Sequence, residues 1–121
     1  MADATKKRFI ALFLAPTSVL ADWAKTDPGV RKPAEQKMQA EWRKWMGEHA
    51  KMIPLTEAGG KTKRVTASGV SDTKNEIMLY SFVEADSHEA AAKMFENHPH
   101  LQIPHSSIEV MEVRSLGPMQ T

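Results

Sequence analysis

The stretch from Ile77 to Val113 constrains the fold more than any other part of the sequence. Its first segment, Ile77–Val83, predicts a β-strand that is apolar on both faces apart from Ser81. A strand of this kind needs cover on both sides. A helix is expected next, and Ile108–Val113 then alternates between apolar and polar residues, which predicts a second strand near a sheet edge.

Helix signals lie between these two strands. Asp86 with Glu89 three residues later has the spacing of a capping box, so Asp86 is expected to cap the helix. Pro99 is expected to end it, because a proline disfavours helical geometry at the residue before it. The inward stripe is expected to comprise Ala91, Met94, Phe95 and His98.

The strongest strand signal in the first half is Lys7–Leu14, which is again apolar on both faces. Basic Lys6–Arg8, apolar Phe9–Ala15 and small Val19–Ala21 also have the order of a secretory signal. The apolar run is at the short limit for such a signal, so a buried strand is the preferred interpretation.

The connection Ala15–Val30 is expected to hold a short helix, Ser18–Ala24, with Leu20 and Trp23 turned inward. A longer helix is expected to start near Pro33, since proline is favoured in a first turn, and to fray over residues 47–51. Its apolar stripe is formed by Met38, Trp42, Trp45, Met46 and His49.

Weaker signals fill the middle of the chain. Met52–Leu55 predicts a short edge strand interrupted by Pro54. Thr62–Ala67 predicts another, fairly polar strand, and Ser68–Asn75 is expected to be a turn or loop.

The order strand, helix, two short strands, strand, helix, strand predicts an α+β fold of the ferredoxin-like, split β-α-β type with an antiparallel sheet. Two helices can cover only one face of such a sheet, yet its two main strands are apolar on both faces. A second copy on the other face, giving a homodimer, is the simplest solution. One domain is expected over residues 1–121, with its ordered core at about 7–116 and Met1–Thr5 and Gly117–Pro118 as tails.

Composition narrows the function classes. The formal net charge is +1, which argues against nucleic acid or an anionic membrane as a general partner. There is no cysteine, which excludes thiol chemistry and fits a reducing, cytoplasmic setting. No segment has the length of a transmembrane helix, and no motif calls for a cofactor.

Several short motifs resemble the YCII-related family of the dimeric α+β barrel superfamily, in the group named for a D-G-P-F motif. They are Trp42-x-x-Trp45, Gly69–Lys74, Val83–Ser87, Glu89-Ala90, His98-Pro99 and Ser107–Val110. The resemblance spans Lys7 to Leu116 and implies a homodimer with a pocket between sheet and helices in each subunit. Two places depart from the pattern: Ser68–Ser71 keeps only the glycine of D-G-P-F, and Arg31–Glu35 lacks the histidine that some relatives pair with an aspartate.

Histidine is the side chain best suited to proton transfer near neutral pH. His49, on the inward stripe of the long helix, and His88, at the start of the second, are therefore the candidate catalytic residues. The candidate pocket residues are Trp42, Trp45, Met46, Tyr80 and Asp86. Their simpler interpretation is ordinary core, and for Asp86 a helix cap.

His98, His100 and His105 are the candidate metal ligands, but their spacing fits no standard metal motif. The preferred interpretation places His98 at a helix C-terminus and His100 in a solvated loop. Three functions stay open: a protein that binds a small cyclic or aromatic metabolite, with or without a cofactor-free reaction catalysed by histidine; an accessory protein without chemistry; and a metal-dependent enzyme.

Overall fold

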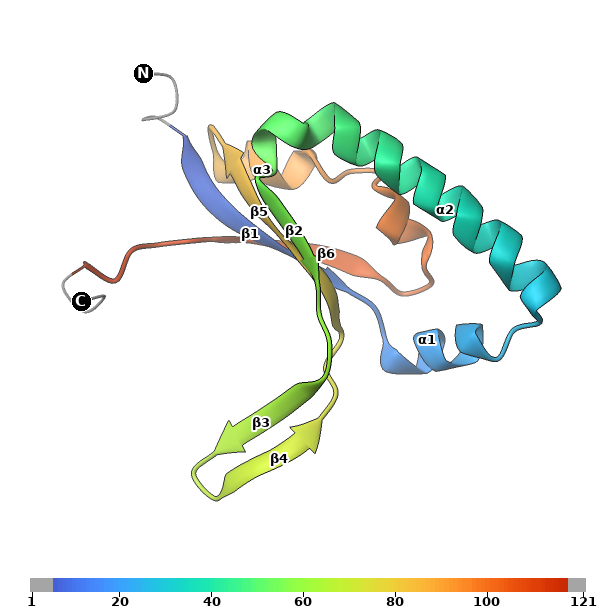
Figure 1. Cartoon of the computed structure of the whole chain (residues 1–121). Helices are drawn as coiled ribbons and strands as arrows, with labels where there is room; N and C mark the ends of the chain where they lie inside the picture. The colour runs from blue at the N-terminus through green and yellow to red at the C-terminus, as the bar shows by residue number, and fades with distance from the viewer. Residues whose placement is uncertain (1–5, 118–121) are drawn as a thin grey trace.

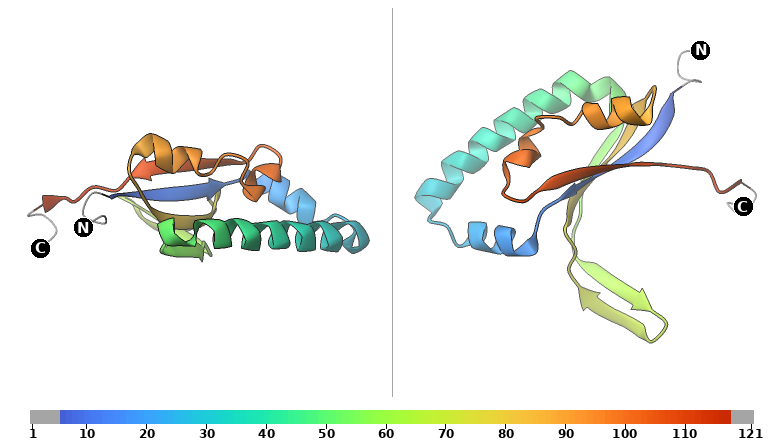
Figure 2. Two further views of the ribbon diagram at one scale, coloured as in Figure 1. Left: turned by 90° about the horizontal axis from the view of Figure 1, so that it is seen from above. Right: turned by 180° about the vertical axis from the view of Figure 1, so that it is seen from behind.

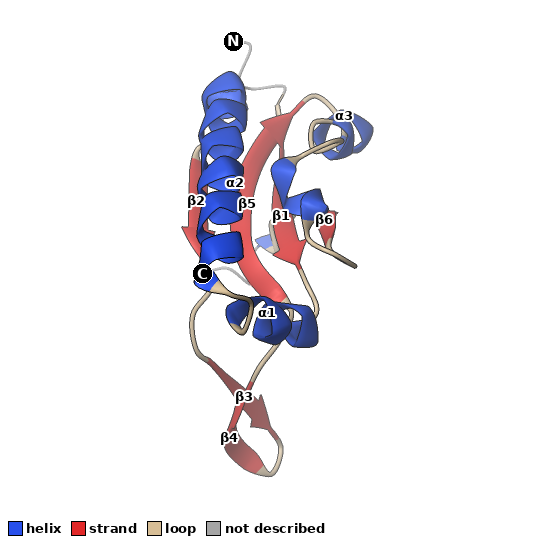
Figure 3. Ribbon diagram, turned by 90° about the vertical axis from the view of Figure 1, so that its right-hand side faces the viewer, coloured by secondary structure: helices blue, strands red, loops and turns tan. Residues whose placement is uncertain are grey.

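The computed structural model describes residues 6–117 and has the expected ferredoxin-like α+β fold. An antiparallel four-stranded sheet in the order β2-β5-β1-β6 carries α2 and α3 on one face (Figure 1, Figure 3). In chain order, the elements are β1 (Lys7–Leu14), α1 (Thr17–Ala24), α2 (Pro28–His49), the 3₁₀ turn η2 (Ala50–Met52), β2 (Leu55–Ala58), β3 (Thr62–Thr66), β4 (Gly69–Thr73), β5 (Ile77–Ala85), α3 (His88–Lys93), the 3₁₀ turn η3 (Pro99–Gln102) and β6 (Ser107–Glu112). The expected tail Met1–Thr5 and Pro118 lie outside the described residues.

The two strands that the sequence marks most clearly form the centre of the sheet. β1 pairs with β5 along its whole length and with β6 on its other side. β2 also runs antiparallel to β5, so β1 and β2 are parallel with β5 between them. This is the split β-α-β arrangement.

The core lies between this sheet and the two helices. Phe9, Ala11 and Phe13 alternate along β1 toward the helices, and all three are fully buried. Trp45 from α2 and Ala91 from α3 belong to the same cluster. Each large side chain buried here contributes about 1.5–3 kcal/mol relative to its exposed state.

The long helix starts earlier than the sequence predicts. α2 begins at Pro28, capped by Asp27, whose carboxylate accepts a hydrogen bond from the Gly29 N–H at 3.0 Å. The predicted start at Pro33 is wrong, and this proline lies inside the helix. The capping aspartate followed by Pro28 in the first position outweighs the later proline.

The cap of α3 also differs from the prediction. Ser87, not Asp86, is the cap, and its hydroxyl accepts from the backbone N–H three residues on at 3.0 Å. Asp86 instead forms an ion pair with Lys6 at 3.0 Å, and its side chain is 77% exposed. The predicted end at Pro99 is wrong as well, because α3 ends at Lys93 and hydrogen-bonded turns follow.

Two predictions for the middle of the chain are wrong. The strand expected at Met52–Leu55 lies three residues later, as β2, although it does occupy a sheet edge. Pro54, which has no N–H to donate, precedes it. The loop expected at Ser68–Asn75 contains β4, which pairs with β3 as a separate two-stranded sheet (Figure 1). Its polar residues conceal the strand period.

The sheet face opposite the helices, called the open face below, is largely apolar. By alternation and register it presents Ile10, Leu12, Leu14, Leu55, Met78, Tyr80, Phe82 and Met111, with the charged residues Arg8, Glu57, Glu84 and Glu109. All of these are half-buried or exposed. A hollow of about 280 Å³ lies on this face beside Arg8, Leu55 and Phe82. Over residues 6–117, no helix has the length and apolar character to cross a bilayer.

Candidate functional site

The strongest concentration of chemistry lies under α2, where η3 meets the core. We call this set the ring cluster; it comprises Phe13, Trp42, Trp45, His49, Phe95, His98 and His100. Trp45 contacts the rings of His49, Phe95 and His98, so it links the two sides of the cluster.

His98 is at the centre of the ring cluster. Only 1% of the residue is exposed. The backbone is extended at His98, as the following Pro99 requires, and this places the imidazole as the cap of η3. Its Nδ1 accepts a hydrogen bond from the His100 backbone N–H at 2.9 Å.

This hydrogen bond fixes which ring nitrogen of His98 carries the proton. Burial, then the nearby charges of His100 and His49, lower the pKa of His98 to about 4, so the ring is neutral at pH 7. A neutral imidazole has one N–H, and Nδ1 is an acceptor, so Nε2 must carry the hydrogen. Nε2 is buried and has no hydrogen-bond partner among the described residues.

Aromatic rings surround His98. Trp42 lies edge-to-face at a centroid distance of 4.3 Å, and Trp45 lies at 4.4 Å in a similar arrangement. An N–H facing an indole ring gains a weak contact only. A buried donor without an acceptor costs about 1–3 kcal/mol, so this nitrogen is the least satisfied polar atom of the cluster.

His49 has the complementary hydrogen-bonding pattern. Its Nδ1 lies 2.7 Å from the Trp45 carbonyl oxygen, and a carbonyl only accepts, so Nδ1 donates. In its neutral form His49 therefore carries a lone pair on Nε2. Its ring stacks on Trp45 at 3.9 Å. One indole thus separates a potential base, His49, from a potential donor, His98.

His100 is buried rather than solvated, so the preferred interpretation of this segment was wrong. Its exposure is 1%, and Nε2 donates to the Leu14 carbonyl at 2.8 Å. Burial lowers its pKa, although the backbone contacts with Leu14 and Ser107 act in the opposite direction. The cause of the burial is η3, which turns the chain back over the end of β1.

The histidines of this segment do not assemble as metal ligands. His98 and His100 each commit one ring nitrogen to a backbone contact, and His105 is exposed with a left-handed backbone, φ 61°. Across residues 6–117 no group of three or more histidine, aspartate or glutamate side chains is placed to hold a metal ion.

The structure brings together some of the side chains that were expected to line a pocket. Trp42, Trp45, Met46 and His49 all lie on the inward stripe of α2 against the core. The remaining candidates lie elsewhere. Tyr80 is on the open face and donates a hydrogen bond to Glu57 at 2.5 Å, and this bond raises the pKa of Tyr80. Asp86 forms its exposed ion pair with Lys6. His88 stacks on Phe9, and its Nε2 donates to the Val110 carbonyl at 2.7 Å.

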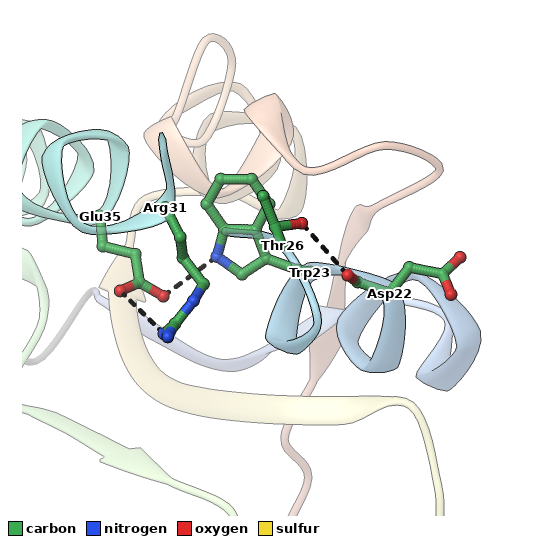
Figure 4. Close-up of polar contacts among 5 residues, drawn as sticks. All are labelled: Asp22, Trp23, Thr26, Arg31 and Glu35. Carbon is green, nitrogen blue, oxygen red and sulfur yellow. Dashed lines mark hydrogen bonds and ion pairs between the residues drawn. The ribbon is translucent and has the colours of Figure 1, made fainter. Parts of the chain in front are cut away.

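A polar cluster that the sequence did not reveal joins α1 to the start of α2 (Figure 4). The Trp23 indole N–H donates to Glu35 at 3.0 Å, and Arg31 lies 3.6 Å from the same carboxylate. Trp23 is 37% exposed, so the expectation that it points into the core was wrong. The ion pair of Arg31 and Glu35 occupies the place where some members of the family that the motifs resemble carry a histidine.

No protein-family model matches the chain, and no curated protein sequence matches it. Among solved structures it is similar to 5-chloro-2-hydroxyhydroquinone dehydrochlorinase from Burkholderia phenoliruptrix AC1100, solved with 2,5-dihydroxybenzoquinone. The identity is 14%, the TM-score is 0.49, and the match covers 88% of this chain and 92% of that one. Similarity at this level carries no conclusion about shared chemistry, and the YCII-related family stays a prediction from the motifs.

Proposed function

We propose that this chain binds a small cyclic or aromatic metabolite at the ring cluster, with His98 donating a hydrogen bond to an oxygen of the ligand. The observation that carries the proposal is the buried Nε2–H of His98, which has no acceptor among the described residues. The aromatic rings around it supply the apolar walls that small-molecule sites require.

The state of His98 narrows the ligand class. A neutral imidazole that is held as a donor suits a carbonyl, enolate or phenolate oxygen, and it does not suit a cation. Its pKa of about 4 keeps it neutral over the physiological range. The ligand is therefore a ring that bears an acceptor oxygen.

Binding requires one side chain to move. Nε2 is covered in this structure. Among the aromatic rings that contact His98, Trp42 is half-buried and the others are buried, so Trp42 is the ring that can move toward solvent. Rotamer changes of this kind are common when proteins bind a partner. The ligand ring then takes the place of the Trp42 indole beside His98.

Catalysis by this site would use the two histidines differently. His49, with its free Nε2 lone pair, would accept a proton, and His98 would stabilise negative charge that develops on the ligand oxygen. His88 stacks on Phe9 and contacts the Val110 carbonyl instead, so it has no part in this pair, and its catalytic role stays a prediction.

A second function is favoured by one observation. The rings pack closely around His98, at 4.3 and 4.4 Å, and close packing is also what an ordinary core shows. In that case the protein is an accessory protein without chemistry. The two functions differ in whether the donor of His98 is used.

The proposed functional unit is a homodimer. The open face presents the apolar side chains of both central strands to solvent in the single chain. Contiguous apolar surface of this kind marks an interaction site, and a symmetric pair covers it with one contact. Cytoplasmic location stays a prediction from composition.

The test compares two probes that differ in one carbonyl, acetophenone and ethylbenzene. Ligands of this size are expected to bind with Kd of about 1 mM. One hydrogen bond to His98 is worth about 1 kcal/mol, so wild-type protein should bind acetophenone about fivefold more tightly, measured by quenching of tryptophan fluorescence.

The matched variants are His98→Phe, which keeps a ring and removes the donor, and His105→Phe, which changes an exposed histidine. The preference for acetophenone should disappear in the first and persist in the second. Equal affinities for the two probes in wild-type protein, or no binding of either, would favour the accessory protein.

A further inference from the structure

The hairpin of β3 and β4 stands away from the rest of the molecule. We call residues 61–74 the arm. Its strands pair only with each other, in a sheet of their own, and the right-hand view of Figure 2 shows it projecting beyond the end of the four-stranded sheet. Within the two strands only Thr62 and Thr73, at the base, are half-buried. A two-stranded hairpin on its own is marginally stable in water.

The arm exposes an apolar pair. Val65 and Val70 lie directly opposite each other across the two strands, and they are 75% and 65% exposed. The ion pair of Lys63 and Asp72, at 2.6 Å, lies on the same face two residues nearer the base. Valine is favoured on strand surfaces that are covered, so this exposed pair is suited to contact another molecule.

The arm and the open face have opposite charge. The arm carries Lys61, Lys63, Arg64 and Lys74 against the single carboxylate of Asp72. The open face carries Glu57, Glu84 and Glu109 against the single cation of Arg8. Complementary fields of this kind favour correct pairing of two surfaces and raise the rate of association.

The arm also leaves room at its base. A hollow of about 610 Å³ lies between the arm and the start of α1, bordered by Thr17, Lys61, Lys74 and Ile77. The arm is therefore not folded against its own body, and its apolar pair is free to meet another molecule.

We propose that the arm of one copy packs on the rim of the open face of a second copy, with Val65 and Val70 on apolar side chains and the cationic residues beside Glu57, Glu84 or Glu109. The inference rests on the proposed homodimer and specifies how its two subunits hold each other. In a twofold-symmetric dimer the same contact forms twice, with the arm of each subunit on the open face of the other.

The experiment measures the dimer dissociation constant by sedimentation velocity over a dilution series. In the double variant Val65→Thr/Val70→Thr the β-branched shape is kept, so the hairpin is retained, but the apolar contact is lost from both arms. The dissociation constant should rise about tenfold or more. The matched control, Ser71→Thr, adds a methyl group to the opposite face of the arm and should leave it unchanged.

The outcomes separate this inference from the dimer itself. A wild-type dimer whose double variant dissociates at the same concentration overturns the arm contact and leaves the proposed dimer intact. A wild-type monomer at every concentration overturns both.

A second measurement uses the absence of cysteine in the chain. A spin label on Val65→Cys should be immobilised in the dimer and become mobile on dilution, whereas a label on Glu96→Cys in α3's following turn should be mobile throughout. A Val65 label that is equally mobile at both concentrations contradicts the proposal.

Discussion

Protonation of the buried His98 side chain is costly in the folded protein. The free energy of unfolding should therefore depend on the pH at which His98 titrates. Its pKa of about 4 in the folded chain lies below the ordinary value of 6.5. The unfolded chain therefore takes up the proton first, and stability is lost as the pH falls from 6.5 toward 4. His98 alone should account for a loss of about 3 kcal/mol by pH 4, measured as the free energy of unfolding in urea.

The variant His98→Phe should show less of this decline, while His105→Phe, which keeps His98, should follow wild type. Burial lowers the pKa of His100 too, so part of the decline should persist in both. If the free energy of unfolding depended on pH identically in wild type and His98→Phe, the lowered pKa of His98 would be contradicted.

Trp45 and Trp23 test the distinction between buried and exposed rings. Trp45 is 8% exposed at the centre of the ring cluster, so Trp45→Ala should reduce the free energy of unfolding by about 3–5 kcal/mol. Trp23 is 37% exposed, and Trp23→Ala should cost about 1–2 kcal/mol. Thermal melts followed by circular dichroism would show the order, and equal losses would contradict it.

At the residue scale, the sequence predicted an inward position for His98, because it follows Phe95 by three positions on a helical stripe. His98 is buried, but it lies after the end of α3 and has an extended backbone. The hydrogen bond that the His98 side chain accepts from the His100 N–H could not be predicted, because it depends on a 3₁₀ turn after Pro99. The burial of His100 could not be predicted either, because it depends on the packing of His100 against the end of β1.

The α3 cap provides a prediction at the scale of an element. Ser87→Ala removes the hydroxyl that accepts the Ala90 N–H and should cost about 1 kcal/mol. Asp86→Ala removes only an exposed ion pair and should cost less than about 0.5 kcal/mol. The reverse order in urea denaturation would restore Asp86 as the cap.

Elements with a strong apolar period were predicted closely. β1 has the predicted bounds, and β5 is two residues longer than predicted. β4 was missed, since all its side chains but Thr73 are exposed and no core face imposes alternation on it. The start of α2 was missed because Asp27 and Pro28 read equally well as a turn.

For the whole molecule, the open face predicts assembly. Leu12 lies at its centre, opposite Tyr80 on one side and Glu109 on the other. A charge buried at such an interface without a partner is strongly unfavourable, so Leu12→Glu should convert the proposed dimer to a monomer in sedimentation experiments.

The control is Val30→Glu, which makes the same kind of change at a residue on α2 that is 62% exposed. It should remain dimeric. If wild type, Leu12→Glu and Val30→Glu all sediment with the same mass, the open face is not the interface.

The fold as a whole followed from the order of the elements and from two strands that are apolar on both faces, since these features leave few topologies. The function did not follow from it. One ferredoxin-like frame serves many activities, and the feature that favours a site here is one unsatisfied nitrogen that only the packed chain reveals.

The most direct test of this account is the NMR signal of the His98 imidazole, followed through its long-range nitrogen–proton correlations while acetophenone is added. The account predicts a neutral ring with hydrogen on Nε2, whose signal shifts on binding as a carbonyl accepts that hydrogen. A His98 signal that stays in place at about ten times the expected Kd of 1 mM would contradict it, and His98 would then be a residue of the core alone.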